Sequence, residues 1–311
     1  MEKIAVIGTG LIGRAWAMVF ARAGHEVALY DADPKALKTN LAVIRRALRD
    51  LRAAGIVKEA PELIYKRIRA AASLEDALAE ADYAQENVSE TLAAKKRIFA
   101  AMDALARPGV ILASSTSTIP ASAFTKELKG RSRCLVAHPV NPPHLVPLVE
   151  LCPSPWTSKR VLARARALHE SVGQVPITVK KEIQGFILNR LQAAVLNEAL
   201  SLYADGYASA ADIDKTVRDG LGLRWSFMGP FETIDLNAPG GVADYAARYG
   251  QVMYEQVCSQ APRRWTKDVV ARLARERRAA LPASDLARRQ AWRDRRLMAL
   301  AVHKREASKK A

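Results

Sequence analysis

Short apolar runs alternate with stretches of helical periodicity over residues 1–181 of the chain. The runs are short, and most are rich in β-branched residues, which is typical of buried strands. They lie at Ile4–Ile7, Glu26–Tyr30, Tyr83–Gln85, Val110–Ala113, Leu135–Ala137, Leu148–Leu151 and Val175–Val179. Strands that alternate with helices favour a mostly parallel, doubly wound sheet. This part of the chain is therefore predicted to be an α/β domain.

The pattern changes twice along the chain. Between the second and third runs, residues 34–72 carry apolar positions at helical spacing, and Gly55 is expected to divide them into a helical pair. After residue 181 the periodicity is helical, as in Phe186–Ala204 and Ala210–Gly220, and no further strand-like run follows. We expect an α/β domain over residues 1–181 with a helical insertion near 34–72, and an all-α domain over residues 182–311.

Composition narrows the classes of protein only partly. The net charge of +16 fits an anionic partner, whether nucleic acid, a membrane surface, an anionic cofactor or an acidic substrate. The odd set of Cys134, Cys152 and Cys258 indicates neither a disulfide framework nor a thiolate metal cage, which favours a reducing, cytoplasmic setting. No metal is expected, because His138 and His144 lack a third ligand nearby. No export or membrane insertion is expected, since no long apolar run occurs.

The clearest motif is the glycine loop Gly8-Thr9-Gly10-Leu11-Ile12-Gly13, which follows the first strand and opens a helix. The first glycine permits a tight turn, the second lets the backbone approach a pyrophosphate, and the third lets the helix pack on the strand. The helix N-terminus then faces the phosphates. We expect a dinucleotide at Gly8, Gly10, Leu11, Ile12 and Gly13, the alternative being a glycine-rich turn without a ligand.

Asp31 ends the second predicted strand, eighteen residues after Gly13. A carboxylate there can accept hydrogen bonds from ribose hydroxyls and repels a 2′-phosphate. The sequence therefore predicts NAD rather than NADP. The alternative is that Asp31 caps a turn together with Asp33.

Candidate catalytic groups follow the later strands. Two apolar runs flank a proline-rich turn, so His138 and Glu150 can meet, and the carboxylate can then fix the histidine tautomer during base catalysis. The hydroxyl-rich run Ser114–Thr118 follows another strand at the carboxyl edge of the sheet, where ligands bind. A buried structural His–Glu pair is the alternative. Hydrolytic chemistry is disfavoured because no G-x-S-x-G motif occurs.

These residues resemble the 3-hydroxyacyl-CoA dehydrogenase superfamily, and within it the λ-crystallin/L-gulonate 3-dehydrogenase branch, over almost the whole chain. In that superfamily a serine, a histidine twenty-one residues later, a glutamate twelve residues beyond it and an asparagine in a G-F-x-x-N-R segment form the active site. They fall here on Ser117, His138, Glu150 and Asn189. The resemblance implies a Rossmann-type domain, and it implies that His138 takes the hydroxyl proton while Ser117 and Asn189 bind the reacting oxygen.

The resemblance also implies cofactor contacts at Glu90, Lys95, Ser117 and Asn141, and a homodimer formed through the C-terminal domain. Two departures from the CoA-using branch concern the substrate. His138-Pro139-Val140-Asn141-Pro142 replaces its H-F-F-N-P, which suggests a smaller or differently shaped pocket. A longer segment, residues 220–230, adds Arg224, whose guanidinium could bind the carboxylate of a free hydroxy acid. The alternative is a surface arginine paired locally.

The expected substrate is a small L-3-hydroxy acid of the L-gulonate type, and alternatives stay open. Residues 230–233 and 236–238 match the gulonate branch, whereas residues 224–229 also match carnitine dehydrogenases. Arginines near residues 45–52 could instead meet the phosphates of a CoA thioester such as 3-hydroxybutyryl-CoA, although a solvated helix face explains them as well. A non-catalytic, crystallin-like role is the rival of another class. Nucleic-acid binding is disfavoured, because no aromatic platform accompanies the arginine-rich C-terminal region.

Overall fold

The computed structural model describes residues 1–309, which divide into two compact units. The first unit comprises Met1–Asn189 and the segment from Gln290 onward, and the second is Arg190–Arg289. The division thus differs from the expected single boundary after residue 181. The end of the chain returns to the first unit because Leu297 and Met298, on helix α14 (Leu286–Ala307), pack against its apolar core.

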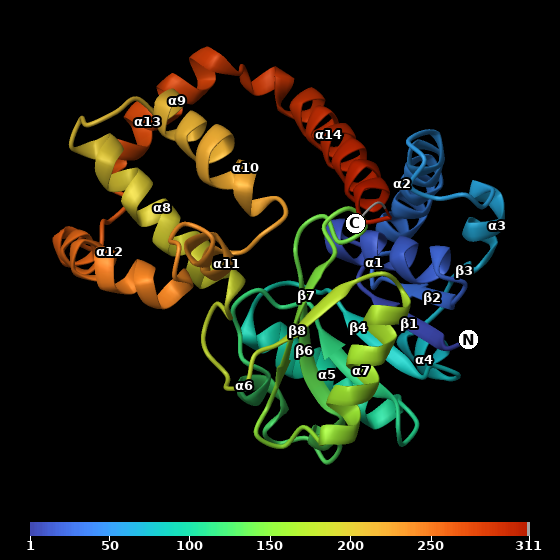
Figure 1. Ribbon diagram of the computed structural model, residues 1–311. Helices are drawn as coiled ribbons and strands as arrows, with labels where there is room; N and C mark the ends of the chain where they lie inside the picture. Colours follow the sequence, from blue (N-terminus) through green and yellow to red (C-terminus); the bar gives the residue numbers. More distant parts are fainter. Residues whose placement is uncertain (310–311) are drawn as a thin grey trace. The chain divides into compact units, whose positions relative to one another are not determined.

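An eight-stranded sheet forms the centre of the first unit (Figure 1). Its order is β3-β2-β1-β4-β5-β6-β7-β8, and all neighbours are parallel except β6 and β7. The strands are β1 (Lys3–Ile7), β2 (Glu26–Tyr30), β3 (Ile68–Ala70), β4 (Tyr83–Glu86), β5 (Ile111–Ser114), β6 (Cys134–Pro139), β7 (Leu148–Pro153) and β8 (Val175–Thr178). The expected mostly parallel, Rossmann-type sheet is confirmed.

The segment expected to be a helical insertion is only partly helical. It contains α2 (Pro34–Ala53) and α3 (Pro61–Lys66), but it ends in the edge strand β3. Only Ile68 of β3 is buried, and three residues are too few to show the alternation by which a strand is recognised. The helical insertion expected near residues 34–72 therefore ends at Lys66, before the strand.

Helices cover both faces of the sheet and bury two separate apolar cores. Trp16 and Phe20 of α1 (Leu11–Arg22) belong to one core, to which α2 and α7 (Lys159–Ser171) also contribute. Phe99 of α5 (Leu92–Leu105) belongs to the other. That second face is completed by the short helices α4 (Leu74–Leu78) and α6 (Ala121–Thr125), and the turn η1 (Arg131–Arg133) precedes β6.

The second unit is entirely helical where it has regular structure, so the expected helical C-terminal domain is confirmed. Its elements are α8 (Leu188–Ala204) from Arg190 onward, α9 (Ala210–Lys215), the π-helical turn η2 (Thr216–Leu221), α10 (Gly222–Trp225), α11 (Pro230–Asp235), α12 (Gly241–Ser259), α13 (Lys267–Ala280) and the 3₁₀ turn η3 (Ala283–Asp285). Among residues 1–309, no helix is both long and apolar enough to cross a membrane.

Candidate active site

The glycine loop has the geometry of a phosphate cradle. Gly8 has a φ of 90°, and a Cβ on Gly13 would lie 1.8 Å from the Gly8 carbonyl oxygen, so both positions require glycine. A Cβ on Gly10 would instead point into open space, where a ligand can approach the backbone. No side chain caps the first turn of α1, which leaves its amides available to phosphate oxygens. The loop therefore fits a dinucleotide pyrophosphate.

Asp31 lies directly beside this loop. One carboxylate oxygen accepts hydrogen bonds from the backbone amide and the hydroxyl of Thr9, both at 2.7 Å, and the other accepts one from the Asp33 amide at 3.0 Å. Burial pushes the pKa of Asp31 upward, but these hydrogen bonds outweigh it and hold the pKa below its usual value. Asp31 thus carries a negative charge at the end of β2 and also ties the loop to that strand.

His138 and Glu150 face each other across the one antiparallel strand pair of the sheet. They are register partners on β6 and β7, and His138 Nδ1 lies 2.8 Å from Glu150 Oε2. Both side chains are buried. Burial raises the pKa of Glu150, but hydrogen bonds from His138 and from two backbone amides lower it by more, so the carboxyl group is ionised at neutral pH. His138 Nε2 has no hydrogen-bond partner within the described chain.

The second oxygen of Glu150 is held by the start of α8. The amides of Ile187 and Leu188 each donate to Glu150 Oε1 at 2.9 Å. Phe186, directly before them, is buried and has a φ of 49°, a left-handed conformation that costs an aromatic residue about 1 kcal/mol or more. Its ring centroid lies 5.4 Å from that of His138. Phe186 therefore contacts the histidine ring and immediately precedes the amides that hold the carboxylate, two roles that its sequence did not suggest.

Ser117 and Asn189 are brought together from distant parts of the chain. Asn189 Nδ2 donates to the Ser117 carbonyl oxygen at 2.8 Å. The Ser117 hydroxyl has no partner within residues 1–309, so it is available to a ligand. Because Asn189 follows the Leu188 amide that binds Glu150, these contacts join all four residues expected from the sequence into one cluster.

The side chains of Glu90 and Lys95 are hydrogen-bonded to other residues of the chain. Glu90 Oε1 accepts hydrogen bonds from the Thr116 hydroxyl and from the amides of Ser117 and Thr118, at 2.6, 2.7 and 3.2 Å. Lys95 is 1% exposed, and its ammonium group donates to Glu86 at 2.8 Å and to the Val88 carbonyl at 3.1 Å. Glu90 thus fixes the loop that carries Ser117, and Lys95 is surrounded by protein acceptors.

Glu86 is a buried carboxylate that was not among the residues expected at the site. It ends β4, accepts hydrogen bonds from Lys95 and from the Ser114 hydroxyl, and its burial raises its pKa above the usual value. A signal was available, because Glu86 ends a buried strand and a lysine follows nine residues later on a helix.

The remaining expected residues lie elsewhere. Arg224, on α10 of the second unit, is exposed and its side chain has no partner within the described chain. Asn141 is exposed on the turn after β6. No group of three or more His, Cys, Asp or Glu side chains in residues 1–309 is placed to hold a metal ion.

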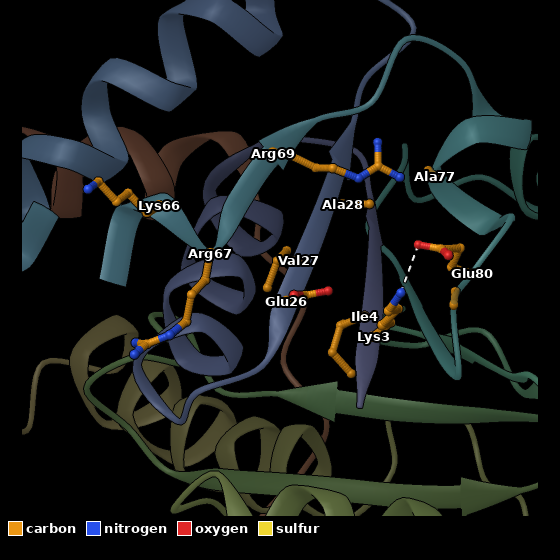
Figure 2. Close-up of a pocket in the computed structure, with 11 residues that line it drawn as sticks. Lys3, Ile4, Glu26, Val27, Ala28, Lys66, Arg67, Arg69, Ala77 and Glu80 are labelled. Atoms are coloured by element: carbon orange, nitrogen blue, oxygen red, sulfur yellow. Dashed lines mark hydrogen bonds and ion pairs between the residues drawn. The ribbon is translucent and has the colours of Figure 1, made fainter. Parts of the chain in front are cut away.

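A cavity of about 370 Å³ lies at the opposite ends of the first strands, where Lys3 begins β1 and Glu26 begins β2 (Figure 2). Most cationic side chains of this cavity already form ion pairs, because Lys3 pairs with Glu80, Arg67 with Glu59, and Arg69 with Asp76. This arrangement leaves the carboxyl edge of the sheet as the location of the candidate active site.

Comparison with known proteins shows the family. The NAD-binding domain of 3-hydroxyacyl-CoA dehydrogenase matches residues 3–183, and the C-terminal domain of the same enzyme matches residues 185–279. The chain therefore belongs to the 3-hydroxyacyl-CoA dehydrogenase family. It is accordingly an NAD-dependent oxidoreductase that acts on CH–OH groups.

Individual relatives fall into several branches of that family. A λ-crystallin homologue of Bos taurus is 41% identical over 97% of this chain and 96% of its own length. An L-carnitine dehydrogenase of Pseudomonas aeruginosa is 38% identical over 81% of this chain and 78% of its own. Among solved structures, an NAD-dependent 5-formyl-3-hydroxy-2-methylpyridine 4-carboxylic acid 5-dehydrogenase has a TM-score of 0.84 at 27% identity, covering 96% of this chain and 97% of that one. The 3-hydroxybutyryl-CoA dehydrogenase of Escherichia coli has a TM-score of 0.67 at 33% identity, covering 76% and 49%.

Proposed function

We propose that this enzyme oxidises the 3-hydroxyl group of a small L-3-hydroxy acid of the L-gulonate type to the 3-keto acid. The observation that carries the proposal is the buried His138–Glu150 pair, which leaves His138 Nε2 without a partner next to the Ser117–Asn189 contact. The match to λ-crystallin relatives over nearly the whole chain supports this branch of the family.

His138 is the general base of the proposed reaction. Its Nδ1 hydrogen is held by Glu150, so Nε2 carries the lone pair that takes the proton of the substrate hydroxyl. The imidazolium that forms is stabilised by the ionised Glu150, which its two backbone amides hold in place. NAD, when bound, supplies the hydride acceptor. The Ser117 hydroxyl and the Asn189 amide bind the reacting oxygen, and Gly8, Gly10, Gly13 and Asp31 hold the dinucleotide.

Three further cofactor contacts are proposed from the family resemblance. Glu90 lies at the Ser117 loop, and Lys95 beside it is buried, so their contribution includes holding that loop for the cofactor. Asn141 follows the catalytic histidine by three residues and has a free side chain within residues 1–309. Arg224 is proposed to bind the acid group of the substrate, because its guanidinium is exposed and unpaired within the same residues.

A comparison of three substrates tests the proposal. NADH formation is measured with L-gulonate, 3-hydroxybutyryl-CoA and L-carnitine under the same conditions. L-Gulonate is expected to have the highest kcat/KM, and a preference for either of the others overturns the substrate order. His138→Gln keeps a polar side chain of similar size but removes the base, so it is expected to abolish turnover of every substrate. Wild-type turnover by that variant would refute the catalytic assignment. A wild-type enzyme that oxidises none of the three would refute the proposed substrate class.

We also propose that the enzyme is a cytoplasmic homodimer formed through the second unit. α12 buries none of its residues, and Val252, Met253 and Val257 on it are all exposed. An apolar surface of this kind is typical of a protein interface. The three cysteines are all unpaired, which suits a reducing compartment. Light scattering is expected to give a dimer mass that Val252→Glu shifts toward the monomer, and a monomeric wild-type enzyme would contradict the proposal.

A further inference from the structure

A cavity of about 250 Å³ in the first unit extends beyond the cofactor contacts proposed above. It lies between α1, α2, the turn after β6 and the beginning of α14. One wall includes Leu11, the residue after Gly10 in the glycine loop, and another includes Asn141, three residues after His138. The cavity is therefore bordered by both the cofactor loop and the turn that follows the proposed base.

Unpaired polar groups line this cavity. Four of its side chains, those of Arg46, Asp50, Asn141 and Gln290, make no hydrogen bond or ion pair within residues 1–309. His144 Nδ1 is buried there without a partner. These four side chains are exposed, whereas the His144 nitrogen is buried. A buried polar atom without a partner costs about 1–3 kcal/mol, so the His144 nitrogen favours a ligand that supplies its partner.

The lining also contains charges of both signs. Burial lowers the pKa of the Arg14 guanidinium, and the nearby charge of Arg46 lowers it further, because the two cations repel each other. Arg14 donates to Asn40, whereas Arg293 pairs with Asp294 on the same helix. Guanidinium and amide groups donate hydrogen bonds, and Asp50 and Asp294 accept them. No Phe, Tyr or Trp side chain lines the cavity.

We propose that this cavity binds the hydroxylated end of the substrate, on the side of the reacting carbon away from the carboxylate. The inference rests on the proposed oxidation of a hydroxy acid, and it names Arg46, Asp50 and Gln290 as residues that determine specificity. Successive hydroxyl groups both donate and accept hydrogen bonds, so they can pair with the donors and with the acceptors of the lining. An anion would pair only with the cationic side chains, and a cation only with the carboxylates.

The same lining disfavours the two competing substrates. The trimethylammonium group of carnitine would meet three guanidinium groups as well as two carboxylates. It has no N–H to donate to those carboxylates, and no Phe, Tyr or Trp ring is there to contact it. An unsubstituted acyl chain would leave the polar groups unpaired, and a site built to bind hydroxyl groups rejects an analogue that lacks them. The cavity thus supplies a physical reason for a preference that the family alone does not determine.

Substitutions on α2 test this proposal with two substrates. Arg46→Met and Asp50→Ala each remove a polar group from the cavity, and Lys38→Met is the control, because it removes a charge from the same helix outside the cavity. The substrates are L-gulonate and L-3-hydroxybutyrate, a free acid without hydroxyl groups beyond the reacting carbon. The two cavity variants are expected to lower kcat/KM for L-gulonate about ten- to hundredfold and to leave L-3-hydroxybutyrate within about twofold.

The outcomes separate this inference from the proposed function. If the wild-type enzyme oxidises L-gulonate but both cavity variants behave like Lys38→Met, or lower both substrates equally, the cavity does not bind the hydroxylated end. If the wild-type enzyme oxidises neither acid, the proposed function fails and this inference fails with it. Calorimetric dissociation constants for L-gulonate in the presence of NADH make the same comparison without turnover, and the cavity variants are expected to raise them about tenfold or more.

Discussion

Replacement of Glu150 by glutamine tests the proposed chemistry at one atom. Glu150 Oε1 accepts two backbone amides at 2.9 Å, so the carbonyl oxygen of the new side chain must take that position. Its NH₂ group then lies where Oε2 was, 2.8 Å from His138 Nδ1, and it can only donate. His138 must therefore carry its proton on Nε2, and the nitrogen that should act as a base becomes a donor.

The expected loss follows from the same geometry. A charged hydrogen bond contributes about 1.5–3 kcal/mol, and Coulomb's law at the observed separation with an effective dielectric constant of about 20 gives about 6 kcal/mol. Stabilisation of the imidazolium by about 3–6 kcal/mol corresponds to a fall in kcat/KM of about 10²- to 10⁴-fold. NAD affinity should not change, since Glu150 does not contact the glycine loop.

NADH formation by Glu150→Gln and the wild-type enzyme measures this effect, with circular dichroism to check that the variant is folded. A folded variant whose kcat/KM stays within about threefold of wild type would show that the carboxylate charge does not assist His138. The His138–Glu150 pair would then be structural.

Three other perturbations address the cofactor loop and the buried histidine. Gly13→Ala places a Cβ against the Gly8 carbonyl, so it is expected to lower the free energy of unfolding by about 1–3 kcal/mol and to weaken NAD binding. The Cβ of Gly10→Ala enters open space, so this variant should weaken only NAD binding. Melting temperatures and NAD titrations distinguish the two variants. Asp31→Asn removes the charge that repels a 2′-phosphate, so the kcat/KM ratio of NADP to NAD should rise about tenfold, and an unchanged ratio would contradict the assignment. Burial lowers the pKa of His169 from 6.5 to about 3, so unfolding takes up a proton as the pH falls below 6.5, and the free energy of unfolding should lose about 2 kcal/mol from pH 7 to pH 5 through this residue. His169→Phe should flatten that loss in urea titrations.

Elements with a strong local signal could be predicted from the sequence. The seven apolar runs and the glycine loop lie where they were expected, because alternation, periodicity and turn-forming glycines act within a few residues. The His138–Glu150 contact could also be predicted, because one short turn connects two antiparallel strands and places the residues opposite each other. By contrast, β3 is a three-residue edge strand, and its pairing with β2 depends on the sheet rather than on its own sequence.

The sequence alone determined the fold class, the dinucleotide loop with its acidic partner at Asp31, and the identity of the four clustered polar residues. Only the tertiary structure decided how those residues are held. The amides of Ile187 and Leu188 reach Glu150 from 37 and 38 residues away, and Asn189 reaches Ser117 across 72. The cavity that we assign to the substrate likewise needs α14 to return to a helix that began at residue 34. Such contacts follow from the packing of whole elements around two apolar cores, and no local pattern of residues encodes them.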